Sequence, residues 1–331
     1  MTTNIGKIGS PGSLPVAVRS SPPPSRSTLL IAFATLYLLW GSTYFAIRVA
    51  VVSWPPFVLA AVRFAVAGGG LYVFLWLRGA PSPSARNWGA ATAVGALLLV
   101  VGNGLVCWAE QWVPSGETAL IIATVPLWMT LLPWLARRAP APRPAVLIGV
   151  AVGLVGVATL VRGGASGSRG SGPASALIAG RIALLAASLS WSLGSLASRR
   201  LPLPDQPFVA TAMEMLTASP LLAGLALGSG AWGRFHLAAV TPAGWIALAY
   251  LIVFGSIAGF GSYVFLLKHT SPARASTYAF VNPLVAVVLG AVAGGEVVGP
   301  RTATAALLIV AAVGAVILGS STPTAAIEDS P

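Results

Sequence analysis

The chain has 331 residues, of which 56% are hydrophobic and only 8% are charged. Soluble domains carry roughly 25% charged residues, because water covers most of their surface. The composition therefore excludes a soluble globular protein and predicts an integral membrane protein. The net charge of +12 does not indicate nucleic-acid binding, since the basic residues lie between hydrophobic blocks and form no single patch.

Ten hydrophobic blocks follow one another, each close to the roughly 20 residues that a helix needs to cross a bilayer core. Helices are expected, because hydrocarbon offers unpaired backbone groups no partner and the blocks lack the alternation of barrel strands. The fold class is thus all-α, with about ten transmembrane helices. In chain order, the predicted crossings are Leu29–Val52, Pro56–Leu77, Trp88–Glu110, Gly116–Leu135, Ala145–Val161, Ala176–Ser198, Pro207–Gly228, Pro242–Leu267, Ala273–Val292 and Arg301–Leu318.

Segments rich in Pro, Ser or Gly divide the chain. Residues 1–27 are expected to form a disordered cytoplasmic tail, because the block that follows is full length and has no small-residue cleavage site of a signal peptide. Residues 321–331 are expected to form a second tail. The Gly/Ser-rich stretch 163–175 is predicted to link two five-helix units, 28–162 and 176–320.

The positive charges predict an orientation. With a cytoplasmic N-terminus, twelve Lys and Arg residues fall in cytoplasmic segments and five in outer segments. This bias predicts that both termini are cytoplasmic in a multi-pass protein of the inner or plasma membrane.

The second half resembles the first at ordered positions. The matched residues, each group at one constant offset, are Trp40 with Trp191, Pro56 with Pro207, Arg63 with Glu214, Gly102 with Gly259, Gly104 with Gly261 and Pro126 with Pro283. Because five crossings turn the second copy upside down, the matches predict two inverted five-helix repeats, an architecture common among carriers. Chance similarity between apolar segments is the alternative.

Several motifs occur in order over residues 28–320. They are Leu39–Arg48, Pro56–Phe64, Trp108–Gly116, Ala123–Leu127, Asn282–Leu284 and Gly295–Glu296. With these motifs the chain resembles the EamA-type ten-helix permeases of the drug/metabolite transporter superfamily. The resemblance implies a basket-like bundle around a central cavity, with the fifth and tenth helices apart from the rest. It leaves the substrate open, since such permeases carry amino acids, nucleosides, sugars or cations. Glu117 and Glu214 depart from the usual pattern.

Charged residues inside the predicted crossings are the sharpest local clue, because burying one costs several kcal/mol. Arg63 and Glu214 lie at equivalent depths, and three interpretations stay open: a structural ion pair, contact of the Arg63 guanidinium with a substrate anion, and proton coupling through Glu214. Glu110 is a candidate for contact with solute. Arg48 is expected to reach lipid headgroups, and Glu117 to sit at a water-facing helix start.

Aromatic and amide side chains inside the crossings complete the candidate cavity. They are Trp40, Tyr44, Trp108, Trp191, Tyr263, Asn103 and Asn282. Aromatic rings stack on flat or cationic substrates, with helix packing as the alternative. Trp residues near helix ends are typical of an interfacial belt; these are Trp54, Trp88, Trp112 and Trp134. Pro126 and Pro283 are hinge candidates, because each removes a backbone hydrogen bond.

Catalysis finds little support in the sequence. There is no GxxxxGK loop, and His236 and His269 lack metal-ligand spacing. Cys107, the single cysteine, is expected to be a buried apolar residue. We therefore expect no enzyme, metal or cofactor, but a monomeric or homodimeric secondary transporter of small polar or amphipathic metabolites, with export favoured and protons as one candidate coupling ion. A channel or a non-transporting membrane sensor or scaffold is the alternative.

Overall fold

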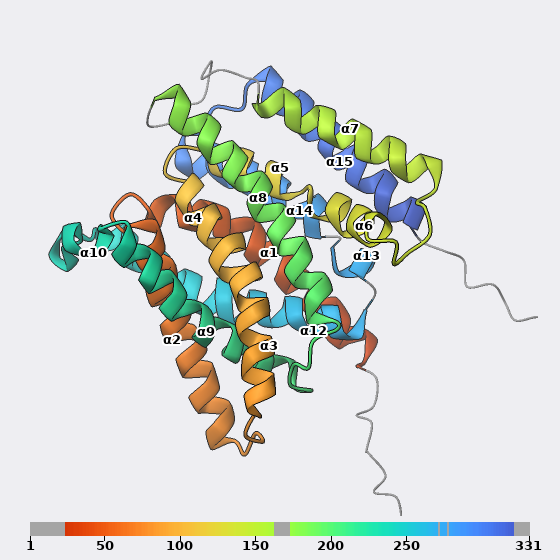
Figure 1. Cartoon of the computed structure of the whole chain (residues 1–331). Helices are drawn as coiled ribbons and strands as arrows, with labels where there is room; N and C mark the ends of the chain where they lie inside the picture. Colours follow the sequence, from red (N-terminus) through yellow and green to blue (C-terminus); the bar gives the residue numbers. More distant parts are fainter. Residues whose placement is uncertain (1–23, 162–172, 271, 277, 321–331) are drawn as a thin grey trace, which may run out of the picture.

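The computed structural model describes residues 24–161, 173–270, 272–276 and 278–320, and within these ranges every regular element is a helix (Figure 1). The predicted tails and linker lie almost entirely outside the described residues. Two helices begin inside stretches that the sequence predicts as tail and linker: the first helix begins at Arg26, and the first helix of the second half begins at Ala174.

The helices of the first half are α1 (Arg26–Ala50), α2 (Pro56–Leu77), α3 (Ala85–Gly95), η1 (Ala96–Asn103), α4 (Gly104–Ala109), α5 (Ser115–Ile122), α6 (Val125–Leu135) and α7 (Pro144–Val161). Those of the second half are α8 (Ala174–Ser198), α9 (Pro207–Gly228), α10 (Ala231–Arg234), η2 (Leu237–Ala239), α11 (Pro242–Tyr250), η3 (Leu251–Phe260), α12 (Gly261–His269), α13 (Pro272–Ala275), α14 (Tyr278–Gly294) and α15 (Pro300–Ser320). η1 and η3 are π-helical, whereas η2 is a single 3-10 turn.

Seven helical runs among the described residues are long and apolar enough to cross a membrane. They are α1, α2, α3–η1–α4, α5–α6, α8, α9 and α11–η3–α12. Three shorter apolar stretches belong to α7, α14 and α15. The all-helical, multi-pass class is therefore confirmed, while ten crossings in two inverted repeats stays a prediction.

Large apolar side chains also cover the outside of the bundle. Leu77, Val292 and Leu307 are among many that are largely exposed. A water-soluble monomer rarely exposes such extensive apolar surface, so this surface suits contact with lipid. Cys107, in contrast, is fully buried, as predicted.

Local sequence signals define several helix starts. The Ser25 hydroxyl accepts a hydrogen bond from the Thr28 N–H at the start of α1. Ser84 and Asn87 form a reciprocal capping box at the start of α3, and Thr241 caps α11. Such caps satisfy backbone N–H groups that have no partner inside the helix.

Two predicted crossings widen into π-helix at corresponding places. η1 interrupts the third crossing and η3 the eighth. Gly102 in η1 and Gly259 in η3 are one of the matched pairs of the two halves. π-Helical turns inside α-helices are frequent at functional sites, which directs attention to the space between these two segments.

The two candidate hinge prolines differ in their surroundings. The fourth crossing breaks between Ile122 and Val125, and Pro126 lies in the first turn of α6, where its missing N–H leaves no hydrogen bond unmade. Pro283 lies within α14, which continues through it. A hinge role for either proline stays a prediction.

Helices of the two halves pack against one another. α2 packs along α9, and α1 along α14. α7 and α15 lie side by side at one edge of the bundle, in agreement with the arrangement that the resemblance implies (Figure 1). A methyl group on Gly153 of α7 would approach Leu127 Cδ1 at 2.8 Å and Ala312 Cβ at 3.1 Å. This face of α7 therefore packs within the chain.

Candidate functional site

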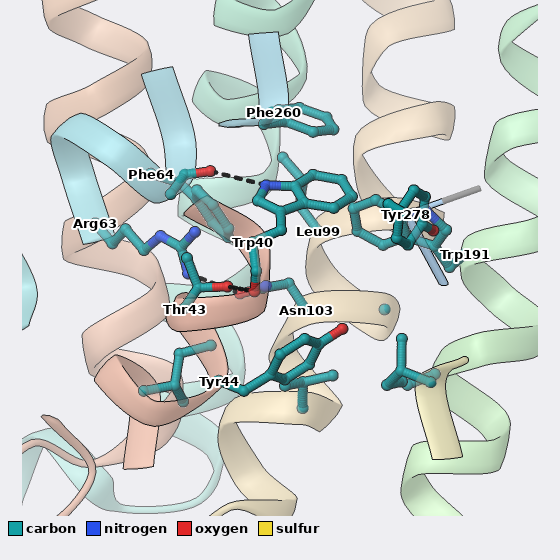
Figure 2. A pocket seen from close by; sticks show the side chains of 16 residues that line it. Trp40, Thr43, Tyr44, Arg63, Phe64, Leu99, Asn103, Trp191, Phe260 and Tyr278 are labelled. Atoms are coloured by element: carbon teal, nitrogen blue, oxygen red, sulfur yellow. Dashed lines mark hydrogen bonds between the residues drawn. The ribbon is translucent and has the colours of Figure 1, made fainter. Parts of the chain in front are cut away.

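A small cavity lies between the two π-helical segments and helices α1 and α2 (Figure 2). The centres of water molecules can occupy a volume of about 50 Å³ in this cavity. That volume is enough for a few waters. A metabolite therefore needs the bundle to open. The lining residues are Trp40, Thr43, Tyr44, Ile47, Arg63, Phe64, Leu99, Gly102, Asn103, Val106, Ile122, Ala187, Trp191, Gly255, Phe260 and Tyr278.

Arg63 brings a buried positive charge to this cavity. Its side chain, 4% exposed, donates from Nε to Ser256 Oγ at 2.7 Å and from Nη1 to Asn103 Oδ1 at 3.4 Å. Its Cζ lies 5.0 Å from the centre of the Phe64 ring. Among the described residues no carboxylate forms an ion pair with it. The guanidinium is thus hydrogen-bonded by neutral side chains and has no direct ion pair among the described residues.

Aromatic rings form another wall of the cavity. The Trp40 indole donates from Nε1 to the Gly255 carbonyl at 3.2 Å (Figure 2). Its ring lies 5.3 Å from that of Trp191, 5.0 Å from that of Tyr263 and 5.3 Å from that of Tyr278, between ring centres. The candidates Trp40, Trp191 and Tyr263 thus lie in one aromatic cluster, in which Tyr263 is fully buried and is not part of the cavity lining; contact with a solute stays a prediction.

The structure does not bring every candidate to this cavity. Trp108 stacks edge to face on Trp112 and borders a separate surface pocket. Glu110 is fully buried but lines none of the described pockets. Asn282, with its amide nitrogen directed toward the Tyr37 and Tyr278 carbonyls at 3.1 and 3.2 Å, ties α14 to α1. These residues stay predictions as solute contacts.

Arg63 and Glu214 do not form an ion pair. Glu214 instead lines a second pocket, where α8, α9 and α12 end or begin, with space of about 310 Å³ for the centres of water molecules. Its carboxylate is fully buried, and neither oxygen has a hydrogen-bond partner among the described residues. Of the three interpretations of this residue pair, the locking ion pair is absent from this conformation.

Glu117 lies in a different environment from the predicted water-facing helix start. It is buried and forms an ion pair with Arg181 of α8, at 2.5 Å from Nε and 3.2 Å from Nη2. The first turn of α5 packs against α8, which removes it from water. Glu296 reaches the same turn and accepts from the Ser115 N–H at 2.9 Å and hydroxyl at 2.8 Å. Acidic residues thus tie α5 to the second half.

Two further expectations about helix ends were wrong. Trp54 is not in an interfacial belt but is 2% exposed, stacked between Phe235 and Trp245 at 5.1 Å from each ring centre. Arg48 is half-buried and donates to the Glu110 backbone carbonyl, where snorkelling to headgroups was expected. In both cases a loop or helix from elsewhere in the chain covers the helix end.

Sequence reasoning missed three polar lining or supporting residues: Thr43, Ser256 and Tyr278. Ser256 is the most informative, because it holds Arg63 from the opposite half of the chain. A polar residue inside an apolar crossing was the available signal, the same signal that drew attention to Asn103. A single Ser within a helix is common, which is why the signal was weak.

The chain matches one family model and several named relatives over most of its length. The model of the "EamA-like transporter family" matches residues 27–162 and 178–318. The chain is 42% identical over 290 residues to "Uncharacterized inner membrane transporter YedA" of Escherichia coli (strain K12), covering 87% of this chain and 90% of that one. It is 22% identical over 279 residues to "Probable amino-acid metabolite efflux pump" of Salmonella typhimurium (strain LT2), covering 83% and 89%.

A solved crystal structure shares the fold. It superposes with a TM-score of 0.60 at 23% identity, covering 89% of this chain and 99% of that one. At this identity the likeness concerns the fold alone.

Proposed function

Because the chain belongs to the EamA-like transporter family, we propose that it is a secondary transporter that moves small polar or amphipathic metabolites by alternating access. The relative named as an inner membrane transporter supports the same membrane here. The charge bias supports cytoplasmic termini. Two inverted five-helix repeats supply the two nearly equivalent halves that such a mechanism needs.

The proposed class of substrate rests on one observation, the buried guanidinium of Arg63. Arg63 is buried in the central cavity and forms no ion pair with a carboxylate of the described residues, although the buried Glu110 acts on it electrostatically. A buried charge without a counter-ion is costly, and a guanidinium fork matches the two oxygens of a carboxylate. We therefore propose a solute that carries a carboxylate and pairs with the guanidinium directly.

The rest of the lining supports an amphipathic solute. Trp40, Tyr44, Phe64 and Trp191 offer ring faces and edges close to the guanidinium, and such walls accept the apolar part of a small metabolite. Amino acids and related compounds combine both features. The relative named as an amino-acid metabolite efflux pump supports this class and favours export.

Metabolite profiling of the medium tests the proposal. Cells expressing wild type, Arg63→Ala, Arg63→Lys or Arg234→Ala are compared at equal membrane abundance, after each purified variant gives one symmetric size-exclusion peak. Arg234 is the control, because it is exposed and lies outside the cavity.

We expect wild type and Arg234→Ala to accumulate the same carboxylate-bearing solutes outside the cell. Arg63→Ala should lose roughly tenfold or more of this flux, because a charged hydrogen bond is worth about 1.5–3 kcal/mol. Arg63→Lys should fall between them, since an ammonium lacks the fork. Equal flux from Arg63→Ala would contradict the proposed role of Arg63.

Counterflow in proteoliposomes distinguishes a carrier from the other classes. Radiolabelled solute outside should accumulate transiently against unlabelled solute inside, and the initial rate should saturate. Flux without saturation would indicate a channel. No flux of any profiled solute in rich and defined media would indicate a sensor or scaffold.

A further inference from the structure

Glu214 is a buried acid that the substrate proposal does not use. It lies in the middle of α9, is 0% exposed, and neither carboxylate oxygen has a hydrogen-bond partner among the described residues. An ionised carboxylate in such a place costs several kcal/mol, because nothing replaces its water shell. The uncharged form, with a proton on one oxygen, is the form that this closed conformation accommodates.

Two other glutamates of this chain, Glu117 and Glu296, have hydrogen-bond partners that give them a structural role. Glu117 is held by two nitrogens of Arg181. Glu296 accepts from the Ser115 N–H and hydroxyl and from the Gly116 N–H at 3.2 Å. Helix packing alone therefore does not explain why an acid stands at position 214.

The corresponding positions of the two halves explain why Glu214 has no partner. Its match in the first half, Arg63, is held by Ser256 and Asn103. At the offset that relates Gly102 to Gly259, Ser256 corresponds to Leu99 and Asn103 to Phe260. Leu99 of the first half and Phe260 of the second half are both apolar, so neither offers Glu214 a hydrogen bond equivalent to those of Arg63.

A pocket at one end of the bundle extends to the side chain of Glu214, whose carboxylate is itself closed off from this space. The pocket that it lines, with space of about 310 Å³ for water centres, holds several waters. Lys268 stands at its mouth, with 42% of its side chain exposed, and pairs there with the exposed Asp205. Glu110 is the other buried acid whose carboxylate oxygens lack a hydrogen-bond partner among the described residues, but Arg48 and Arg63 act on it electrostatically, and it lines none of the described pockets.

The ionisable groups around this pocket are few. The loop after α8 contributes Arg199 and Asp205, and α12 contributes Lys268. Tyr263 of α12 also interacts electrostatically with Glu214. The other elements packed against α9, namely α2, α3, α10 and η1, contribute no ionisable side chain to the described lining.

We propose that Glu214 is a proton-binding carboxyl that exchanges its proton with the cytoplasm through this pocket and couples solute movement to the proton gradient. Per cycle one proton crosses the membrane: it adds from outside water to one carboxylate oxygen while the bundle is open to the outside, and it returns to cytoplasmic water through this pocket when the bundle opens inward. Closing moves α9 against η1, whose Leu98 faces this pocket and whose Leu99 faces the central cavity. The coupling half of the proposal rests on the proposed transport function.

Infrared difference spectroscopy of purified protein in lipid tests proton binding without any solute. A stepwise change of pH should produce a reversible carbonyl band of a protonated carboxyl in wild type. The band should be lost in Glu214→Gln and in Glu214→Met, an apolar variant that covers the case in which a buried amide misfolds. It should persist in the controls Asp205→Asn, at the pocket mouth, and Glu110→Gln. Spectra of Glu214→Met that match wild type would overturn the proposal.

Flux measurements test coupling once the profiled solute is known. An imposed pH gradient should accelerate wild-type flux, and Glu214→Gln should lose this acceleration far more than it loses counterflow. Equal loss of both, with an unchanged size-exclusion peak, would show a structural role instead and overturn the coupling. A wild-type band without solute flux would reject the transport function alone, whereas flux without the band would reject the proton site alone.

Discussion

The Trp40 indole lies directly against Gly259, where a methyl group would approach its Cδ1 and Nε1 at 2.6 Å. Trp191 lies against Gly102 in the same way, with Cε3 at 3.0 Å from such a methyl. Each tryptophan belongs to one half of the chain and each glycine to a π-helical segment of the other half. The two indoles then meet edge to face, 5.3 Å apart. The halves thus close on the cavity through reciprocal contacts.

Alanine at these glycines should therefore displace the tryptophans. For Gly259→Ala and Gly102→Ala we expect a loss of about 1–3 kcal/mol of stability, because the core has no room for the methyl, and a shift in tryptophan emission. Thermal unfolding in detergent and intrinsic fluorescence measure the two effects. Gly70→Ala is the control, since a methyl there meets open space. Unchanged emission in Gly259→Ala would contradict the reciprocal contact.

The buried Glu117–Arg181 pair should be sensitive to removal of one partner. Arg181→Met leaves a buried carboxylate without its counter-ion and should cost about 3–5 kcal/mol. The double variant Arg181→Met/Glu117→Met should recover most of the loss, because both charges are gone. Thermal unfolding of the two single variants and the double variant gives the coupling energy. The exposed Lys268–Asp205 pair is the control, and Asp205→Asn should change nothing measurable. Additive losses would rule out the pair.

Substitutions of Trp54 distinguish a side chain buried in the protein from one that lies in an interfacial belt at the membrane surface. Its Nε1 has no hydrogen-bond partner among the described residues, so Trp54→Phe removes a buried unsatisfied donor and should leave stability unchanged or higher. Trp54→Ala should cost about 3–5 kcal/mol, because it empties the space between Phe235 and Trp245. Chemical denaturation of both variants makes the comparison. Small and equal effects would instead favour an interfacial position.

The Tyr263 hydroxyl supports the cavity wall from behind. It lies 2.6 Å from Ser195 Oγ and accepts from Trp191 Nε1 at 3.1 Å. Tyr263→Phe should cost about 1–3 kcal/mol, because it leaves both groups without this partner, and should change Trp191 emission. Ser195→Ala keeps the bond to Trp191 and should affect emission less. The reverse order of the two emission changes would show that the hydroxyl does not position Trp191.

The sequence by itself determined the class of protein and much of the central cluster. Long apolar blocks with few charges have no stable place in water, so a helical membrane protein followed from composition alone. The matched Trp and Gly positions pointed to residues that the structure does bring together: Trp40 meets Gly259 and Trp191 meets Gly102, each across the interface between the two halves.

Only the tertiary structure decided the partners of the charged and polar groups. Glu117 and Arg181 are 64 residues apart in the chain, and Arg63 and Ser256 are 193 apart. Hydropathy gives the depth of a residue in its helix but not the direction of its side chain relative to neighbouring helices. That direction separates an ion-paired Glu117 from a Glu214 without a partner among the described residues, because the energy of a buried charge depends on which atoms lie within a few ångströms of it.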